Sequence, residues 1–415
     1  MVRDRRAFVG AVSALSLVVA TIGGPSIAFA QSDASCEVTI WGDEITHLSL
    51  ADAAAAYEAE TGVKVNMVGK SFDTMFTDYE TQVPAGTGPD AIIAYQTNMQ
   101  AWAESGIAAP VEIADKLAEF EPVAANSVMF NGKAYSVPLW IENIALIRNT
   151  DLAPTAPATM DELVKMGQGL VAAGKAELPI SIALNPYILY PIATSMGAPY
   201  FTSNADGTYN FSEPQFSSPG GLAYANKLSE WAKSGVLNPN VDGGIALDRF
   251  QTGKSPFLVT GPWDIPTIKA SGVPYVVETI PPTGDLPAAP WAGIAGLILN
   301  PKGACALAAN DFATRFMTTK DAQVSVFKIA AYPPALTAAL AEVGADPDVK
   351  GFGEAGQHST PLIGNSAVGK AINPLYGQTL QAILKGDDAA ALWTDMATTI
   401  EAALKADTSI PATGN

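Results

Sequence analysis

The stretch "VKVNMVGKSFDTMFTDYETQVPAGTGPDAIIAY" (Val63–Tyr95) indicates the fold class of the chain. Val63, Val65 and Met67 alternate with polar residues, which predicts a strand with one buried face. A helical segment follows, and "GTGPD" supplies a turn before a second, apolar strand at Ala91–Tyr95. Two strands joined by a helix predict neighbouring strands of a parallel sheet.

The residues that precede this stretch repeat the pattern. Cys36–Trp41 alternates apolar and polar residues and is predicted to form another strand. Ser49–Thr61 is alanine-rich and helical, and Gly62 is a natural stop because glycine accepts the left-handed conformation that ends many helices. The order strand, helix, strand, helix, strand predicts an α/β fold, with helices on both faces of a parallel sheet.

The same signals return further along the chain. Thr159-x-x-Glu162 is a capping box that opens a helix ending near Gly174, and Leu178–Leu184 reads as a short strand. Apolar stripes at helical spacing predict two more helices, one with Leu222, Ala225, Leu228 and Ala232, the other with Leu392, Met396, Ile400 and Leu404. A chain of 415 residues is long enough for two or more lobes, and the recurrence of the pattern fits this expectation.

The overall charge restricts the partners. The formal net charge is −18, which argues against nucleic acid or an anionic membrane as a binding partner. It suits a protein that binds a neutral or cationic solute. No segment after residue 30 has the length and unbroken apolarity needed to span a bilayer.

The N-terminus has the features of an export signal. An arginine-rich start is followed by the apolar segment Ala7–Ala20, and Ala28-Phe29-Ala30 has the small-x-small form of a leader-peptidase site. Residues 1–30 are therefore predicted to be a signal peptide, with cleavage before Gln31. We expect an exported protein in the periplasm or on the outer face of the cytoplasmic membrane.

Two cysteines, Cys36 and Cys305, remain in the expected mature chain. An even count in an exported protein favours a disulfide, and two separate buried thiols are the alternative.

The common catalytic motifs are absent from the sequence. There is no G-x-x-x-x-G-K-[ST], no H-E-x-x-H and no G-x-S-x-G in a strand–turn–helix context, and His47 and His358 alone cannot build a typical zinc site. We therefore expect no enzyme, no cofactor and no metal. A secreted glycoside hydrolase stays an alternative, with Glu142 and Asp264 as the one tempting pair of carboxyl groups.

Aromatic residues stand beside carboxylates or amides at three places. These are Trp140 with Glu142, "NPYILY" at 185–190, and "GPWDI" at 261–265. A sugar presents apolar CH faces to aromatic rings and hydroxyl groups to carboxylates and amides. The recurrence favours a sugar site, although each aromatic taken singly is more often a core residue.

Several ordered segments resemble the solute-binding proteins of ABC importers, and most of all the maltose/maltodextrin-binding proteins. The segments that carry the resemblance are "YEAETGVKV" (57–65), "GTGPDAIIAY" (86–95), "AESGIAAPV" (103–111), "FNGKAYSVPLWIENIALIRNTDLAP" (130–154), "NPYILYPIATSMGA" (185–198), "GPWDI" (261–265) and "FATRFMTTKDAQ" (312–323). The resemblance implies two α/β lobes, a sugar bound in the cleft between them, and closure by a hinge. It places the first lobe at 37–141 with 292–334, the second at 142–291 with 335–406, and a flexible tail at 407–415.

The resemblance also implies the site. Glu142 falls on a family carboxylate that accepts hydrogen bonds from sugar hydroxyls, Tyr187 and Trp263 on stacking aromatics, and Asp43 and Glu44 on a polar loop of the first lobe. The full predicted set of ligand residues is Asp43, Glu44, Lys70, Gln96, Asn98, Trp140, Glu142, Asn185, Tyr187, Tyr190, Trp263, Asp264, Gly293 and Asn373.

The chain departs from the family at several ligand positions. Ala94, Thr97 and Asn98 stand where the maltodextrin binders have tryptophan, aspartate and arginine, Asn185 replaces a carboxylate, and Asn373 stands for a late tryptophan. These changes put maltose itself in doubt. Trp140, Tyr190 or Trp102 are candidates to compensate, although packing of a helix is the favoured interpretation of Trp102.

Glu142 receives the most specific expectation. We expect it to be wet in the open cleft, ionised at neutral pH and ready to accept sugar hydroxyls. The alternative is a structural salt bridge, with Arg148 or with a lysine across the hinge.

The sequence thus predicts a monomeric carbohydrate receptor that delivers a di- or oligosaccharide to the membrane permease of an ABC importer. A receptor for another small solute, such as a polyamine, is the alternative within the same class.

Overall fold

The structure is a computed structural model that describes residues 36–204, 208–364 and 366–414. The predicted signal peptide and its cleavage site lie outside the described residues. Every helix in the described part of the chain is too short or too polar to cross a membrane.

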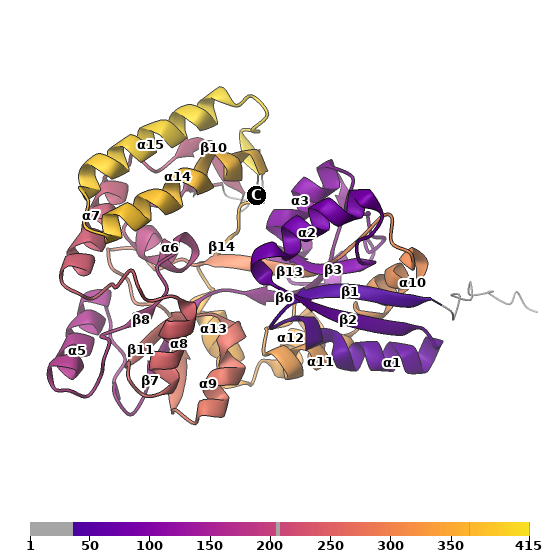
Figure 1. Ribbon diagram of the computed structural model, residues 1–415, viewed down its shortest axis with the longest axis horizontal. Helices are drawn as coiled ribbons and strands as arrows, with labels where there is room; N and C mark the ends of the chain where they lie inside the picture. The colour runs from indigo at the N-terminus through magenta and orange to yellow at the C-terminus, as the bar shows by residue number, and fades with distance from the viewer. Residues whose placement is uncertain (1–35, 205–207, 365, 415) are drawn as a thin grey trace, which may run out of the picture. The chain divides into compact units, whose positions relative to one another are not determined.

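A first sheet of six strands is built around β13 (Figure 1). Its strands are β1 (Glu37–Asp43), β2 (Lys64–Lys70), β3 (Ala91–Tyr95), β6 (Val137–Glu142), β13 (Trp291–Leu299) and β14 (Thr360–Pro361). The strands β1, β2 and β3 are parallel, as predicted. The long strand β13 runs antiparallel to both β3 and β6, so the complete sheet is mixed. The sequence did not indicate this antiparallel strand, because β13 lies about 200 positions after β3 and no local pattern shows that the two strands pair.

Helices cover both faces of this sheet, and the alternation within β1 decides which residue faces which layer. Val38 and Ile40 pack with α1, α10 and α11, whereas Trp41 packs with α2 and α3 on the other face. The helices are α1 (Ala51–Thr61), α2 (Phe72–Ala85), α3 (Gln96–Glu104), α10 (Ala306–Asp311) and α11 (Lys320–Ala330). Gly62 ends α1 with φ of 75°, as predicted.

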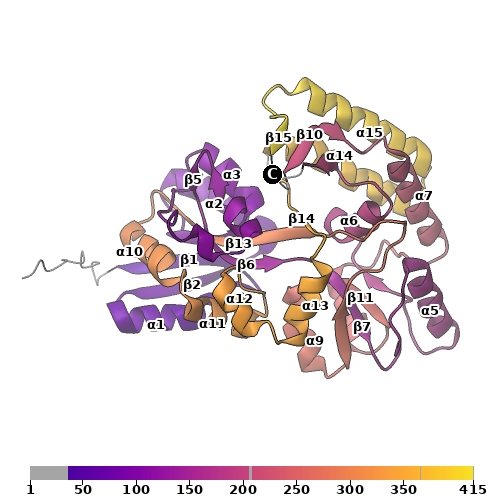
Figure 2. The ribbon, with the colours of Figure 1, turned by 180° about the vertical axis from the view of Figure 1, so that it is seen from behind.

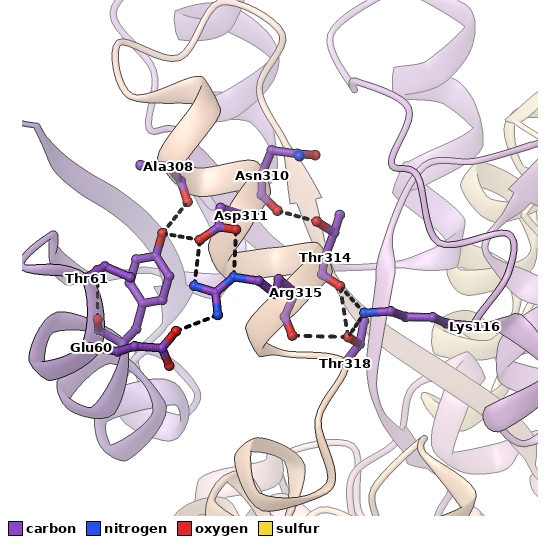
Figure 3. Close-up of polar contacts among 10 residues, drawn as sticks. Glu60, Thr61, Lys116, Ala308, Asn310, Asp311, Thr314, Arg315 and Thr318 are labelled. Carbon is purple, nitrogen blue, oxygen red and sulfur yellow. Dashed lines mark hydrogen bonds and ion pairs between the residues drawn. The ribbon is translucent and has the colours of Figure 1, made fainter. Parts of the chain in front are cut away.

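Shorter elements complete this part of the chain. They are η1 (His47–Leu50), η2 (Leu117–Glu119), α4 (Pro122–Ser127), β4 (Met129–Phe130), β5 (Lys133–Ala134), the π-helical turn η4 (Phe312–Phe316) and α12 (Thr337–Val343). The turn η4 is joined to α1 by a polar network on the surface (Figure 3). Arg315 binds Asp311 and Glu60, and the Tyr57 hydroxyl donates to Asp311. Lys116 donates to the carbonyl of Thr314 within the widened turn, where regular helical bonding is interrupted.

A second sheet has the order β12-β7-β11-β8. Its strands are β7 (Ala145–Asn149), β8 (Ser181–Ile182), β11 (Phe257–Thr260) and β12 (Tyr275–Glu278). The predicted strand Leu178–Leu184 is wrong in length, since only Ser181 and Ile182 are paired. The chain passes from the first sheet to the second between Glu142, the last residue of β6, and Ala145, the first of β7.

Helices again cover both faces of the second sheet. The elements of this part are α5 (Met160–Ala172), α6 (Pro186–Ser195), α7 (Pro219–Lys233), α8 (Gly243–Gln251), η3 (Pro262–Asp264), α9 (Ile265–Ser271), α13 (Pro347–Ala355), α14 (Ser366–Leu384) and α15 (Ala389–Ala406). The helices α5 and α6 lie on one face and α8, α9 and α13 on the other, whereas α14 and α15 pack on each other and on α7. Thr159 caps α5 as predicted, through a bond from the Glu162 amide. In α7 the predicted stripe is partly wrong, because Leu222 is exposed while Tyr224 and Trp231 are buried.

A small third sheet joins β9 (Phe201–Ser203), β10 (Tyr209–Pro214) and β15 (Thr413–Gly414) (Figure 2). The C-terminal residues, expected to form a tail, pair antiparallel with β10 through β15.

Cys36 and Cys305 form a disulfide, which confirms the favoured interpretation of the two cysteines. The bond ties the residue before β1 to the N-terminal end of α10, across a sequence separation of 269.

Candidate functional site

Four side chains gather where strands of the first sheet end, and we call them the strand-end cluster: Asp43, Tyr95, Glu142 and Tyr332. Ala295 of β13 pairs with Tyr95 on one edge and with Trp140 on the other, and Gly293 pairs with Glu142. The antiparallel β13 therefore brings the ends of β3 and β6 together. Sequence reasoning missed Tyr95 and Tyr332, because nothing local shows that strands so far apart in sequence meet here.

Glu142 is the central residue of this cluster. It is 5% exposed, and its Oε2 accepts bonds of 3.3 Å from both the Tyr95 hydroxyl and the Trp140 indole. Gly293 leaves the space that it needs, since a Cβ there would lie 2.9 Å from Glu142 Cγ. Glu142 makes no ion pair with any cation in the described chain.

The electrostatics of Glu142 differ from the expectation. Burial raises its pKa to about 8, the neighbouring Asp43 adds to the rise, and the bonds from Trp140 and Tyr95 oppose it only in part. In this structure Glu142 is thus buried with a raised pKa, which differs from the prediction of a wet, ionised carboxylate. A salt bridge with Arg148 is wrong, since Arg148 binds Glu278 through two bonds of 2.6 and 2.9 Å.

Tyr332 and Trp140 form the wall behind the carboxyl group. Their rings are stacked with centroids 4.7 Å apart, and both are almost fully buried. Burial and then the charges of Glu142, Asp43 and Asp264 hold the pKa of Tyr332 well above its usual value. Trp140 is therefore packed in the core, and its predicted contact with a ligand stays a prediction.

A second group, the aromatic cluster, consists of Tyr187, Trp263 and Trp291. The ring centroid of Tyr187 lies 6.3 Å from that of Trp263 and 6.1 Å from that of Trp291. Trp263 is half-buried and packs against the hydrophobic cores of both large sheets. The Tyr187 hydroxyl has no hydrogen-bond partner among the described residues. Burial and then the Glu142 charge hold the pKa of Tyr187 above its usual value, so the two groups interact.

A pocket of about 280 Å³ adjoins this cluster. It contains three of the positions where the chain departs from the maltodextrin binders, Thr97, Asn185 and Asn373. The complete lining is Thr97, Asn185, Pro186, Tyr187, Tyr200, Trp291, Leu362, Ile363, Val368, Gly369, Ile372 and Asn373. The pocket joins aromatic rings to small amide and hydroxyl groups, and it can seat a ring-shaped polar solute.

Trp291 is a further site residue that sequence reasoning missed. It lies at the start of β13, lines the pocket, and stacks on Tyr190 at 3.8 Å between ring centroids. The available signal was a tryptophan at the start of a long apolar run, "WAGIAGLIL" (Trp291–Leu299). Tyr190 is 1% exposed and serves as the support of Trp291.

Several predicted ligand residues form hydrogen bonds or ring contacts with other residues of the protein. Asp43 accepts from the amides of Ile45 and Thr46 and from the Thr46 hydroxyl, and so fixes the loop after β1. Glu44, which is exposed, accepts from the Phe72 amide.

Two more predicted residues also have internal partners. Lys70 lies over the Trp41 ring, 4.1 Å from its centroid. Gln96 is buried and binds β13 through the Ala292 carbonyl and the Ile294 amide.

At the second sheet, Asn185 caps α6 by accepting from the Ile188 amide. Asp264 accepts a bond of 2.6 Å from Thr260, and burial raises its pKa. Asn98 is half-buried, and Asn373 is exposed at the pocket. Ligand contacts by all these residues stay predictions.

The described residues contain no group of three or more His, Cys, Asp or Glu side chains placed to hold a metal ion. The sequence profile of bacterial extracellular solute-binding proteins matches residues 52–351. The chain belongs to this family. The predicted two-lobed α/β fold of such solute-binding proteins is thereby confirmed.

The individual relatives share only 25% to 26% sequence identity with this solute-binding protein. It is 26% identical to a maltotriose-binding protein of Pyrococcus abyssi over 288 residues, which are 67% of this chain and 62% of that protein. It is 25% identical to a galactooligosaccharide-binding protein of Bacillus subtilis, over 65% of this chain and 66% of the relative. The match thus spans slightly less than two-thirds of these two relatives.

A third relative matches over nearly its whole length. It is a maltooligosaccharide ABC transporter solute-binding lipoprotein of Streptococcus pneumoniae, 25% identical over 96% of this chain and 97% of its own.

Proposed function

We propose that this solute-binding protein is the exported carbohydrate receptor of an ABC importer. It binds a di- or oligosaccharide at the strand-end and aromatic clusters and delivers it to membrane permease subunits. It acts as a monomer, binds no nucleic acid and catalyses no reaction.

The observation that carries the proposal is the composition of the site. Tyr187, Trp263 and Trp291 supply aromatic faces, and the Glu142 carboxyl group, which accepts a bond from Tyr95, is close enough to Tyr187 to influence its pKa. Aromatic faces suit the CH faces of a pyranose, and carboxyl and amide groups suit its hydroxyls. The three relatives named above carry oligosaccharide names, which supports this class of ligand.

The two lobes of the proposal correspond to the two large sheets. The chain crosses between them at 142–145, again between β12 and β13, and again between α12 and α13, and Glu142, Trp291 and Gly293 lie at the first two crossings. Closure about these crossings upon binding is the conformational change that we propose.

A thermal-shift panel tests the proposal. The purified protein is heated with maltose, maltotriose, a galactooligosaccharide and, as a cationic control, spermidine. A sugar at a hundred times its dissociation constant should stabilise the native state by about 2.7 kcal/mol. Stabilisation by spermidine alone would contradict a carbohydrate ligand and favour the polyamine alternative.

The same samples test for catalysis. After long incubation, chromatography of the sugars should recover them unchanged. Shorter products in amounts proportional to protein would contradict a pure receptor and favour the hydrolase.

A further inference from the structure

The carboxyl group of Glu142 is enclosed by residues from several elements, and none of them contributes a paired cation. Gly293 of β13 lies against its side chain, and Tyr95 and Trp140 donate to the same oxygen, Oε2. The titratable groups that act on it are Asp43 at the end of β1 and Tyr95 at the end of β3. Its own charge acts on Tyr187 in α6 and on Tyr332 after α11, and Asp264 in η3 also acts on Tyr332. Lys70, at the end of the neighbouring β2, lies over Trp41.

This geometry disfavours the carboxylate form of Glu142. A buried charge needs a counter-ion or several short hydrogen bonds. Glu142 has two bonds of 3.3 Å, which is long for a charge-assisted bond, and Asp43 adds a repulsive charge. Both observations favour the neutral acid, in keeping with a pKa that burial raises to about 8. A carboxyl group with such a pKa is mostly protonated at pH 7.

We propose that Glu142 becomes a carboxylate when a sugar binds, so that each binding event releases its proton to the solvent. The inference rests on the proposed function. Sugar hydroxyls that donate to the carboxyl oxygens favour its charged form, and Oε1 makes no hydrogen bond within the described chain. No covalent bond changes: the acid loses H⁺ to the buffer, and the sugar stays intact.

Proton release makes affinity depend on pH with a defined sign. The free protein must lose a proton before it forms the complex, so acid weakens binding. If the pKa in the complex falls to the ordinary value for glutamate, affinity rises about 50-fold from pH 6 to pH 8. A complex in which Glu142 stays protonated would bind equally well across this range.

Titration calorimetry with maltotriose tests the inference on the full mature chain. Heats measured at pH 7 in phosphate and in Tris differ by the number of protons released times the difference between the ionisation enthalpies of the two buffers. We expect about 0.9 protons released per sugar. Binding without a buffer-dependent heat, and with an affinity that does not change between pH 6 and pH 8, would overturn the inference.

Variants assign the proton to its source. Glu142→Gln cannot ionise, so its binding should release no proton and its affinity should be flat with pH. Asp348→Asn is the matched control, because Asp348 is a buried carboxyl group outside the site that pairs with Lys269, and it should keep the release. Release that persists in Glu142→Gln, or that disappears in Asp348→Asn alone, would overturn the assignment to Glu142.

A second variant keeps the test decisive if Glu142→Gln does not fold. Tyr95→Phe removes one donor to Glu142, so the pH range over which affinity rises should move to higher pH. An unchanged pH range would count against the inference.

The buffer comparison on the wild-type chain needs no variant. Absence of binding by every sugar of the panel at every pH would overturn the proposed function, and this inference with it. Binding without proton release overturns the inference alone.

Discussion

The buried carboxyl group of Glu142 should make the stability of the ligand-free protein fall as pH rises. Its pKa is about 8 in the folded chain and about 4.5 when unfolded. Between these values the folded state holds a proton that the unfolded state has lost. Stability therefore decreases with rising pH, by about 1.4 kcal/mol per unit at most. Integrated from pH 5 to pH 8, the contribution of this one group is about 3.5 kcal/mol.

The comparison with Glu142→Gln isolates this contribution. Every other titrating group acts on both proteins, so the difference in unfolding free energy between them reports Glu142 alone. Urea denaturation is measured at pH 5, 6, 7 and 8. From pH 5 to pH 8 the unfolding free energy of the variant should rise by about 3.5 kcal/mol relative to that of the wild type. Parallel pH profiles for the two proteins would refute the reasoning, because they would mean that Glu142 is solvated or paired in the folded chain.

Three further predictions concern the site and its scaffold. Trp263→Ala should weaken sugar binding by about 1–3 kcal/mol in calorimetry, because an aromatic face of the site is lost; an unchanged dissociation constant with a sharply lower melting temperature would assign Trp263 to the core alone. Gly293→Ala should cost about 1–3 kcal/mol in urea denaturation, since its Cβ would lie 2.9 Å from Glu142 Cγ, whereas Gly353→Ala, with open space around its Cβ, should cost nothing; equal effects would contradict close packing at Glu142. Replacing Cys36 and Cys305 by serine should lower the unfolding free energy by about 2–4 kcal/mol, because the disulfide closes a long loop; an unchanged urea midpoint would show that the bond does not constrain the unfolded chain.

The early strands and helices could be read from the sequence because their signals are local. Alternation in β1 and β2, the apolar run of β3 and the stop at Gly62 each depend on neighbouring residues. The order of these elements then indicated parallel pairing, which the structure confirms. The family could also be recognised, because its ordered segments lie within such local elements.

The environment of Glu142 was decided only by the tertiary structure. Its burial depends on β13, which follows about 150 residues later and brings Tyr95 beside it. The partner of Arg148 was likewise set by the pairing of β7 with β12, which places Glu278 within reach. A sequence shows that a carboxyl group stands in an apolar stretch, but its protonation depends on dielectric surroundings and neighbouring charges. Those come from strands that meet only when the chain has folded.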